Sequence, residues 1–153
     1  MTLKETITND MRAAFKAGDQ VTRGALTMLL SVIQNREIAK RTKTGSSDLT
    51  EEETIEALTS EMKKRRESAA TYTQGGRPEL AEKEEAEAAV LARYLPEQLT
   101  EDVVKALVAE AITATGASGP KDIGKVMGAV TPKTKGRFDG ARVSELVKSA
   151  LAS

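Results

Sequence analysis

Apolar residues recur every three or four positions along almost the entire chain of 153 residues, and this spacing places them on one face of an α-helix. Residues 26–33 and 104–112 show the pattern most clearly. No segment alternates apolar and polar residues as a half-buried strand does, and the four prolines lie at boundaries between periodic segments. We therefore expect an all-α protein.

Local signals predict where the first helix begins. Thr2 and Glu5 have the spacing of a capping box, in which each side chain bonds the backbone N–H of the other residue. The apolar face that starts at Leu3 is completed near its end by either Ala14 or Phe15. The residue pattern leaves both choices open.

The second helix is predicted to have a wide apolar face that contacts neighbours on two sides. Gly18 followed by Asp19 is typical of a helix end and the N-cap of the next helix. We expect the second helix to run to about Lys40. Residues 41–48 are rich in Thr, Ser and Gly, which predicts an exposed, mobile loop.

The third and fourth helices are predicted to form a hairpin. The third begins at a second capping box, formed by Thr50 and Glu53. Gly75 and Gly76 end it, and Pro78 lies in the first turn of the fourth helix, where proline is favoured.

The segment that starts at Pro96 interrupts the helical pattern, and we place a domain boundary there. Residues 1–95 are expected to form a helical hairpin domain of about four helices, and residues 96–153 a small domain of three helices. The middle helix of the second domain is expected to start at Ser118 to Pro120 and to stop at Pro132.

Two charged residues, Arg65 and Glu84, occupy positions that apolar residues otherwise fill in the third and fourth helices. If these helices fold back on each other, the two residues lie within one helical turn of the same level. This predicts a partly buried ion pair that sets the register, with Glu85 or Glu87 as alternative partners. In the competing interpretation, both side chains extend to water.

Composition excludes several kinds of chemistry. The chain has no His and no Cys, which excludes the usual zinc sites, Cys–His nucleophiles, Ser-His-Asp triads and iron–sulfur clusters. The acidic run at residues 82–87 has a spacing that suits Mg²⁺ or acid–base chemistry, but a solvated helix face explains it better. We expect no cofactor and no metal site.

Hydropathy and the N-terminal segment predict the location. No apolar run approaches the ~20 residues that a bilayer span requires, and the N-terminal segment lacks the pattern of a signal peptide. We expect a cytoplasmic protein that does not associate with membranes.

The best candidate site lies near the C-terminal end. Residues 121–142 contain six basic and two acidic residues, a local charge of +4 in a chain whose 23 basic and 23 acidic residues balance. Gly124 and Gly128 lie one turn apart inside a predicted helix, where each costs up to ~1 kcal/mol relative to alanine. A neighbouring helix explains them as well as a closely approaching phosphate backbone does. The candidate RNA- or phosphate-binding residues are Gly124, Lys125, Gly128, Lys133, Lys135, Arg137 and Arg142, and Phe138 offers one ring for base stacking.

These motifs resemble those of a known family. Gly-Lys-Val-Met-Gly at 124–128, followed by Gly-Arg-Phe-Asp-Gly at 136–140, is similar to the C-terminal signature of YqeY-like proteins. Lys-Lys-Arg-Arg-Glu-Ser at 63–68 and Tyr-Leu-Pro-Glu-Gln-Leu at 94–99 resemble the same family. The resemblance covers essentially the whole chain and implies a fold of two helical parts.

The resemblance also implies a function. YqeY-like proteins are similar to the tail of the B subunit of the tRNA-dependent amidotransferase, and the family label is a carbon–nitrogen ligase with glutamine as amido-N-donor. This implies a tRNA-binding or amidotransferase-associated module. Because the chain has no Cys nucleophile, we expect no catalytic centre of its own. The alternatives are a protein–protein adaptor for an amidotransferase or synthetase, and the ligase activity itself.

Overall fold

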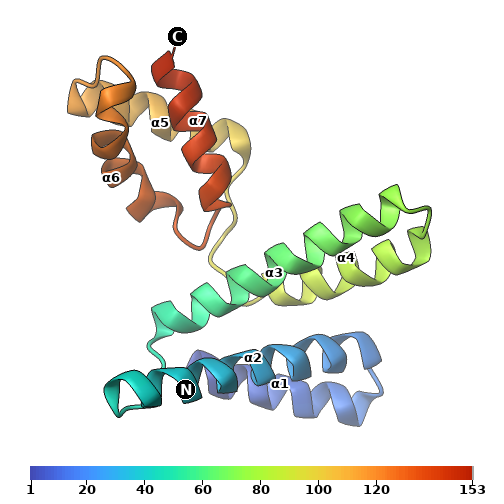
Figure 1. Ribbon diagram of the computed structural model, residues 1–153. Coiled ribbons are helices and arrows are strands. Elements are labelled where there is room, and N and C mark those ends of the chain that lie inside the picture. The colour runs from blue at the N-terminus through green and yellow to red at the C-terminus, as the bar shows by residue number, and fades with distance from the viewer. Residues whose placement is uncertain (153) are drawn as a thin grey trace. The chain divides into compact units, whose positions relative to one another are not determined.

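The computed structural model describes residues 1–152, and every regular element in this range is helical (Figure 1). The elements in chain order are α1 (Leu3–Ala17), α2 (Gln20–Thr44), α3 (Glu51–Gln74), α4 (Pro78–Ala92), α5 (Glu101–Thr115), the 3-10 helix η1 (Pro120–Asp122), α6 (Ile123–Thr134) and α7 (Gly140–Ala152). The all-α class is confirmed. Over residues 1–152, none of the helices combines the length and the apolar character needed to cross a lipid bilayer.

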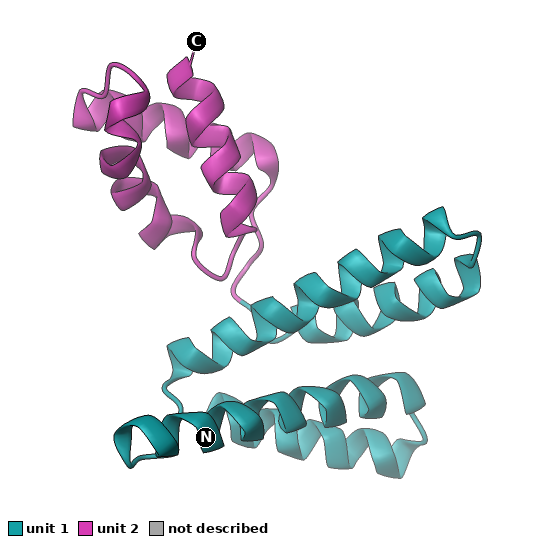
Figure 2. Ribbon diagram, viewed as in Figure 1, with its two compact units in different colours: residues 1–95 teal, residues 96–153 magenta. Residues whose placement is uncertain are grey.

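The chain divides into two compact units, unit 1 (Met1–Leu95) and unit 2 (Pro96–Ser153) (Figure 2). Unit 1 contains α1 to α4, and the described part of unit 2 contains α5, η1, α6 and α7. Each unit has a hydrophobic core of its own.

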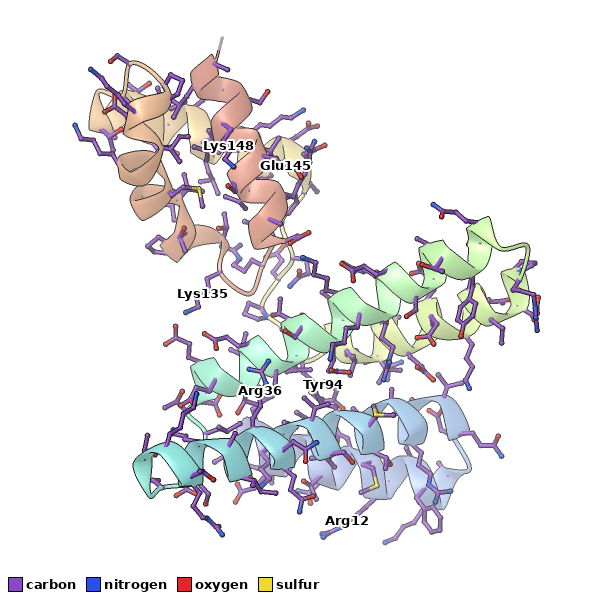
Figure 3. All side chains as sticks on the ribbon, viewed as in Figure 1. Arg12, Arg36, Tyr94, Lys135, Glu145 and Lys148 are labelled. Carbon is purple, nitrogen blue, oxygen red and sulfur yellow. The ribbon has the colours of Figure 1, made fainter. Side chains whose placement is uncertain are left out.

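Unit 1 consists of two helical hairpins, α1–α2 and α3–α4, packed against each other. Gly76, with a φ of 73°, makes the turn between α3 and α4. Tyr94, just after α4, joins the hairpins, because its hydroxyl donates a hydrogen bond of 2.6 Å to Oδ2 of Asp10 on α1 (Figure 3).

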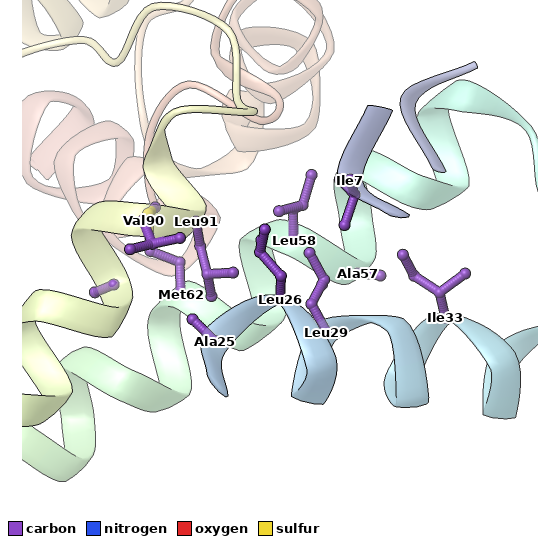
Figure 4. Packing of buried hydrophobic residues seen from close by; sticks show 11 residues of the cluster. Ile7, Ala25, Leu26, Leu29, Ile33, Ala57, Leu58, Met62, Val90 and Leu91 are labelled. Carbon is purple, nitrogen blue, oxygen red and sulfur yellow. The ribbon is translucent and has the colours of Figure 1, made fainter. Parts of the chain in front are cut away.

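The core of unit 1 draws aliphatic side chains from all four helices (Figure 4). Its fully buried large residues are Ile7, Leu26, Leu29, Ile33, Leu58 and Leu91. Burying each of them contributes roughly 1.5–3 kcal/mol. Small residues such as Ala25, Ala57 and Ala88 lie between them and let the helix backbones approach closely.

The predicted helix starts are confirmed by their hydrogen bonds. In α1 the Thr2 hydroxyl accepts from the Glu5 N–H at 3.1 Å, and a carboxylate oxygen of Glu5 accepts from the Thr2 N–H at 2.8 Å. Thr50 and Glu53 form the same capping box at α3. Asp19 caps α2 by accepting from the N–H of Thr22 at 3.1 Å.

The structure selects Ala14, and not Phe15, for the buried face of α1. Ala14 is 6% exposed, whereas Phe15 is 58% exposed. The Asp19 N–H bonds the Ala14 carbonyl at 2.9 Å, so the tight turn holds α1 and α2 close together at this end. The space between the helices there accepts a methyl group rather than a phenyl ring.

The predicted end of the second helix at Lys40 is wrong, because α2 continues to Thr44. It ends at Gly45, which has a φ of 80° and donates its N–H to the carbonyl of Arg41 at 2.9 Å. Lys40 also supports the extra turn, since its Nζ reaches Oε1 of Glu53 on α3 at 2.7 Å. The segment predicted to be a loop is therefore helical in its first half.

The predicted stop of the sixth helix at Pro132 is also wrong. Helical structure begins with η1 at Pro120, as expected, but α6 runs through Pro132 to Thr134. Proline removes one N–H from a helix, and the carbonyl left without a helical donor is that of Gly128. Thr134 is 3% exposed, so burial in unit 2 holds the last turn in helical form.

Unit 2 packs α5, α6 and α7 around a core rich in valine. Its buried valines are Val104, Val108, Val126, Val130, Val143 and Val147. The turn after α6 is tied to the segment before α5, because the N–H of Leu99 donates to the Arg137 carbonyl at 2.8 Å. The Gln98 side chain donates to the Gly136 carbonyl at 2.9 Å.

Candidate nucleic-acid interface

Gly124 and Gly128 lie on the exposed side of α6. In the described chain, a methyl group built at either position would meet nothing within 4 Å apart from the adjacent residues and the nearby backbone of α6 itself. Packing against a neighbouring helix of residues 1–152 therefore does not require these glycines. They open the α6 backbone to solvent instead.

Pro132 removes one hydrogen bond from α6. Because proline has no N–H, the carbonyl of Gly128 has no donor at position 132, four residues later. This carbonyl is therefore a main-chain acceptor without its usual helical partner.

The predicted lysines divide between two sides of α6. Lys125 lies beside the glycines, with its side chain 68% exposed and its Nζ 3.8 Å from Oδ1 of Asp122. Lys135 is exposed, and its position directly after α6, seven residues beyond Gly128, places it on the same side. Lys133 is exposed, but a spacing of five residues from Gly128 places it on another flank.

Arg137 is engaged within unit 2. Its Nε donates to the Glu97 carbonyl at 3.0 Å, and its Nη1 donates to the Lys133 carbonyl at 3.3 Å. These contacts join the turn after α6 to the segment before α5. Neutral carbonyls, and not carboxylates, accept these hydrogen bonds, so they do not offset the positive charge of the guanidinium.

Arg142 is paired with two carboxylates. Its Nη1 lies 2.9 Å from Oε2 of Glu145, and its Nε lies 2.7 Å from Oε1 of Glu101 at the start of α5. The hydrogen bonds to Glu145 and Glu101 hold the pKa of Arg142 above its already high ordinary value. The structure places this arginine in a link between α7 and α5.

Asp122 precedes α6 and bonds the loop before η1 rather than capping α6 with its side chain. It accepts a hydrogen bond of 2.9 Å from the backbone N–H of Ser118, and this bond lowers the pKa of the Asp122 carboxyl, with the charges of Lys125 and Lys121 adding to the effect. Asp122 thereby ties Ser118 to the residue after which α6 begins.

The charged positions in the α3–α4 seam form a cluster around Arg65. Its Nε lies 3.1 Å from Oε2 of Glu87, and its Nη1 lies 3.9 Å from Oε2 of Glu84. Glu61, whose side chain is 5% exposed, lies 3.9 Å from Nη2 of Arg65. One partly buried guanidinium thus faces three carboxylates, while Glu85 is exposed.

The exposed ring of Phe15 was not predicted from the sequence. Phe138, the ring expected to stack on bases, is half-buried and packs against the core of unit 2. The exposed ring is Phe15 in unit 1, and the guanidinium carbon of Arg23 lies 4.3 Å from its centroid. From the sequence, either Ala14 or Phe15 could lie on the buried face of α1. The packing of α2 against α1 buries Ala14 and leaves Phe15 exposed.

These features define an all-helical protein of two compact units with an open, basic helix face in unit 2. The family model described as Yqey-like protein matches residues 4–151, and the chain belongs to this family. No curated protein matches the chain.

Proposed function

We propose that this protein is a tRNA-binding or tRNA-amidotransferase-associated accessory module without a catalytic centre of its own, acting in the cytoplasm. The observation that carries the proposal is the open side of α6, where Gly124 and Gly128 face no other residue of the described chain. Glycine is unfavourable in a helix, at Gly128 more than at Gly124 in the first turn of α6, and a closely approaching ligand gives both a function.

The charges beside the glycines suit a phosphate backbone. Lys125 and Lys135 share the open side of α6, and Arg137 holds its charge close to the same helix end. Lysines that neutralise phosphates release counterions, which is the main source of affinity for nucleic acid. We assign Arg137 and Arg142 to positioning the site, and Lys133 to a contact on the flank.

The Gly128 carbonyl, which lacks its helical donor, favours RNA as the ligand. A main-chain acceptor at Gly128 suits a ribose 2′-hydroxyl, which can donate a hydrogen bond and which DNA lacks. The ligase label of the family requires a nucleophile to release ammonia from glutamine, and this chain has neither Cys nor His. In our proposal that chemistry belongs to a partner enzyme.

The test is tRNA binding measured against salt concentration. We expect Lys125→Ala combined with Lys135→Ala to lower the affinity and to reduce the magnitude of the log–log salt slope by about 1.5, since each lost phosphate contact removes roughly 0.7–0.9. The matched control is Lys105→Ala with Lys148→Ala, two exposed lysines on α5 and α7. If the two double variants change the tRNA affinity and the salt slope equally, the assignment of the binding site to α6 is wrong.

The open α6 face also fits a helix of an amidotransferase or synthetase subunit, since small residues permit close helix packing. Capture of such a subunit that survives nuclease treatment and is lost in Gly128→Leu would favour this adaptor function. The same capture, if abolished by nuclease, favours the tRNA-binding function.

A further inference from the structure

An aromatic ring is held open to solvent at the closed end of the α1–α2 hairpin. Phe15 is 58% exposed, and the Arg23 guanidinium of α2 lies 4.3 Å from the ring centroid. A cation over one face of a ring restrains it through a cation–π interaction and leaves the other face free. In the free protein, the ring is therefore already held in place with one face available for stacking.

Two further cations lie on the same side of α1 as Phe15. Arg12 precedes it by three residues, and Lys16 follows Arg12 by four, so the three side chains share one face of the helix. Arg12 projects from α1 into solvent (Figure 3). Within residues 1–152, no carboxylate lies within 4.0 Å of either cation. The nearby acids are used elsewhere, Asp10 by Tyr94 and Asp19 by the cap of α2.

A shallow depression continues from Arg23 along the exposed side of α2. It is lined by Gln20, Arg23, Gly24, Thr27, Met28 and Ser31. Apart from Arg23, none of these side chains is charged, and three of them carry hydrogen-bonding groups. A methyl group at Gly24 would meet nothing within 4 Å in the described chain, so internal packing does not require this glycine either.

These three observations match the chemistry of a single-stranded RNA segment. Its phosphates are anionic, its bases have flat apolar faces, and the base edges carry neutral donors and acceptors. Arg12 and Lys16 supply the cations, Phe15 supplies a stacking surface, and Gln20, Thr27 and Ser31 supply hydrogen bonds without charge.

We propose that the Phe15–Arg23 pair and the adjoining depression form a second RNA site, in unit 1, which takes unpaired bases. This inference rests on the proposed function, because both assign RNA as the ligand, and it adds a different mode of contact. The α6 face contacts backbone phosphate and ribose, whereas the Phe15 site stacks on bases. The ligand class is then an RNA that carries a loop or an unpaired end.

The experiment uses the full chain and a short unstructured RNA that contains 2-aminopurine, whose fluorescence is quenched by stacking. We expect Phe15→Leu to weaken binding of this RNA about five- to a hundredfold and to remove the quenching. Phe15→Tyr keeps the ring and should retain both signals. Ile38→Ala, which alters an exposed apolar side chain on α2, away from Phe15 on α1, is the matched control.

The cations are tested on the same RNA. Arg12→Ala with Lys16→Ala should reduce the magnitude of its salt slope by about 1.5, with Lys43→Ala, an exposed lysine at the end of α2, as control. If Phe15→Leu changes RNA binding no more than Ile38→Ala does, the Phe15 site is overturned. Loss of binding to a protein partner alone, with RNA binding intact, overturns it as well.

The two proposals fail in different ways. If Lys125→Ala with Lys135→Ala leaves tRNA binding unchanged while Phe15→Leu abolishes the quenching, the α6 site fails and the Phe15 site stands. The reverse result retains the α6 site and rejects the Phe15 site. If neither set of changes affects RNA binding, both proposals are rejected.

Discussion

The Nε atom of Arg65 on α3 lies 3.1 Å from Oε2 of Glu87 on α4, one helical turn beyond Glu84, whose Oε2 is 3.9 Å from Nη1 of the same arginine. The contacts are those of an ion pair and not of aligned hydrogen bonds, since Arg65 Nε and Glu84 Oε2 have no hydrogen-bond partner. Glu61 completes the cluster from α3. A single guanidinium thus offsets carboxylates from both helices of the hairpin.

We expect Arg65→Met to destabilise the protein by about 3 kcal/mol, because it leaves the partly buried Glu84 and Glu87 without their shared cation and leaves the buried Glu61 with Lys64 alone, 3.3 Å away. This is the lower end of the cost of breaking a buried pair, since the Arg65, Glu84 and Glu87 side chains keep 15%, 19% and 15% exposure. Urea unfolding provides the measurement. Arg66→Ala, a change at the exposed neighbouring arginine, should stay within about 0.5 kcal/mol. Equal effects of the two changes would show that water, rather than Arg65, compensates the carboxylates.

Gly128→Ala should stabilise the fold by about 0.5–1 kcal/mol, because alanine lowers the entropic cost of the helix and its methyl group meets no atom of the described chain within 4 Å. Thermal unfolding measures the gain. Gly124→Ala, in the first turn of α6, should give less. If the proposed function is correct, Gly128→Ala also weakens tRNA binding. A change that stabilises the protein and leaves tRNA affinity intact would argue against close approach at this glycine.

Arg137→Ala should destabilise unit 2 by about 1–2 kcal/mol, because the Glu97 and Lys133 carbonyls lose their charged donor. The control is Lys133→Ala, which removes an exposed side chain but keeps the carbonyl that Arg137 uses. Hydrogen exchange at the Leu99 amide, which donates to the Arg137 carbonyl, reports the opening of this link. If exchange at Leu99 responds equally to both changes, the guanidinium is not the link.

Tyr94 should make unit 1 sensitive to alkaline pH. Burial raises the pKa of its hydroxyl above the ordinary value of 10.0, and the hydrogen bond to Asp10 raises it further. The unfolded chain therefore loses this proton at a lower pH than the folded chain does. The stabilisation from Tyr94 is fully present below about pH 10 and is lost as the pH rises above it.

The measurement is the free energy of unfolding between pH 7 and pH 11. Tyr94→Phe should cost about 1 kcal/mol at pH 7 through the lost hydrogen bond and should flatten the alkaline decline. Tyr72→Phe, at the other tyrosine of the chain, serves as the control. If the free energy of unfolding of Tyr94→Phe falls as steeply with pH as that of the unchanged protein, groups other than Tyr94 cause the alkaline sensitivity.

Features that depend on neighbours in sequence could be predicted. The capping boxes at Thr2 and Thr50 and the cap at Asp19 form within one turn of the chain, so their residue types are sufficient to identify them. The predicted helix ends at Lys40 and Pro132 were wrong, because these ends depend on contacts between residues far apart in the sequence. In each case a distant contact, the ion pair of Lys40 with Glu53 or the burial of Thr134, extends the helix.

The candidate site was less predictable, because a charge in the sequence carries no information on what neutralises it. Arg142 and Lys125 look equivalent as basic residues, yet Arg142 pairs with Glu101, 41 positions away, while Lys125 lies 3.8 Å from its near neighbour Asp122 and keeps 68% of its side chain exposed. The exposed ring is Phe15 and not Phe138, for a similar reason. Long-range packing decides which groups remain available.

The sequence by itself determined that this chain is helical, where most of its helices start, and that it resembles the YqeY-like family, because helix periodicity, capping and motifs are local properties. Only the tertiary structure decided which glycines face solvent, which arginines are engaged, and that Ala14 rather than Phe15 is buried. Exposure and charge pairing depend on residues far apart in the chain, and folding brings those residues together.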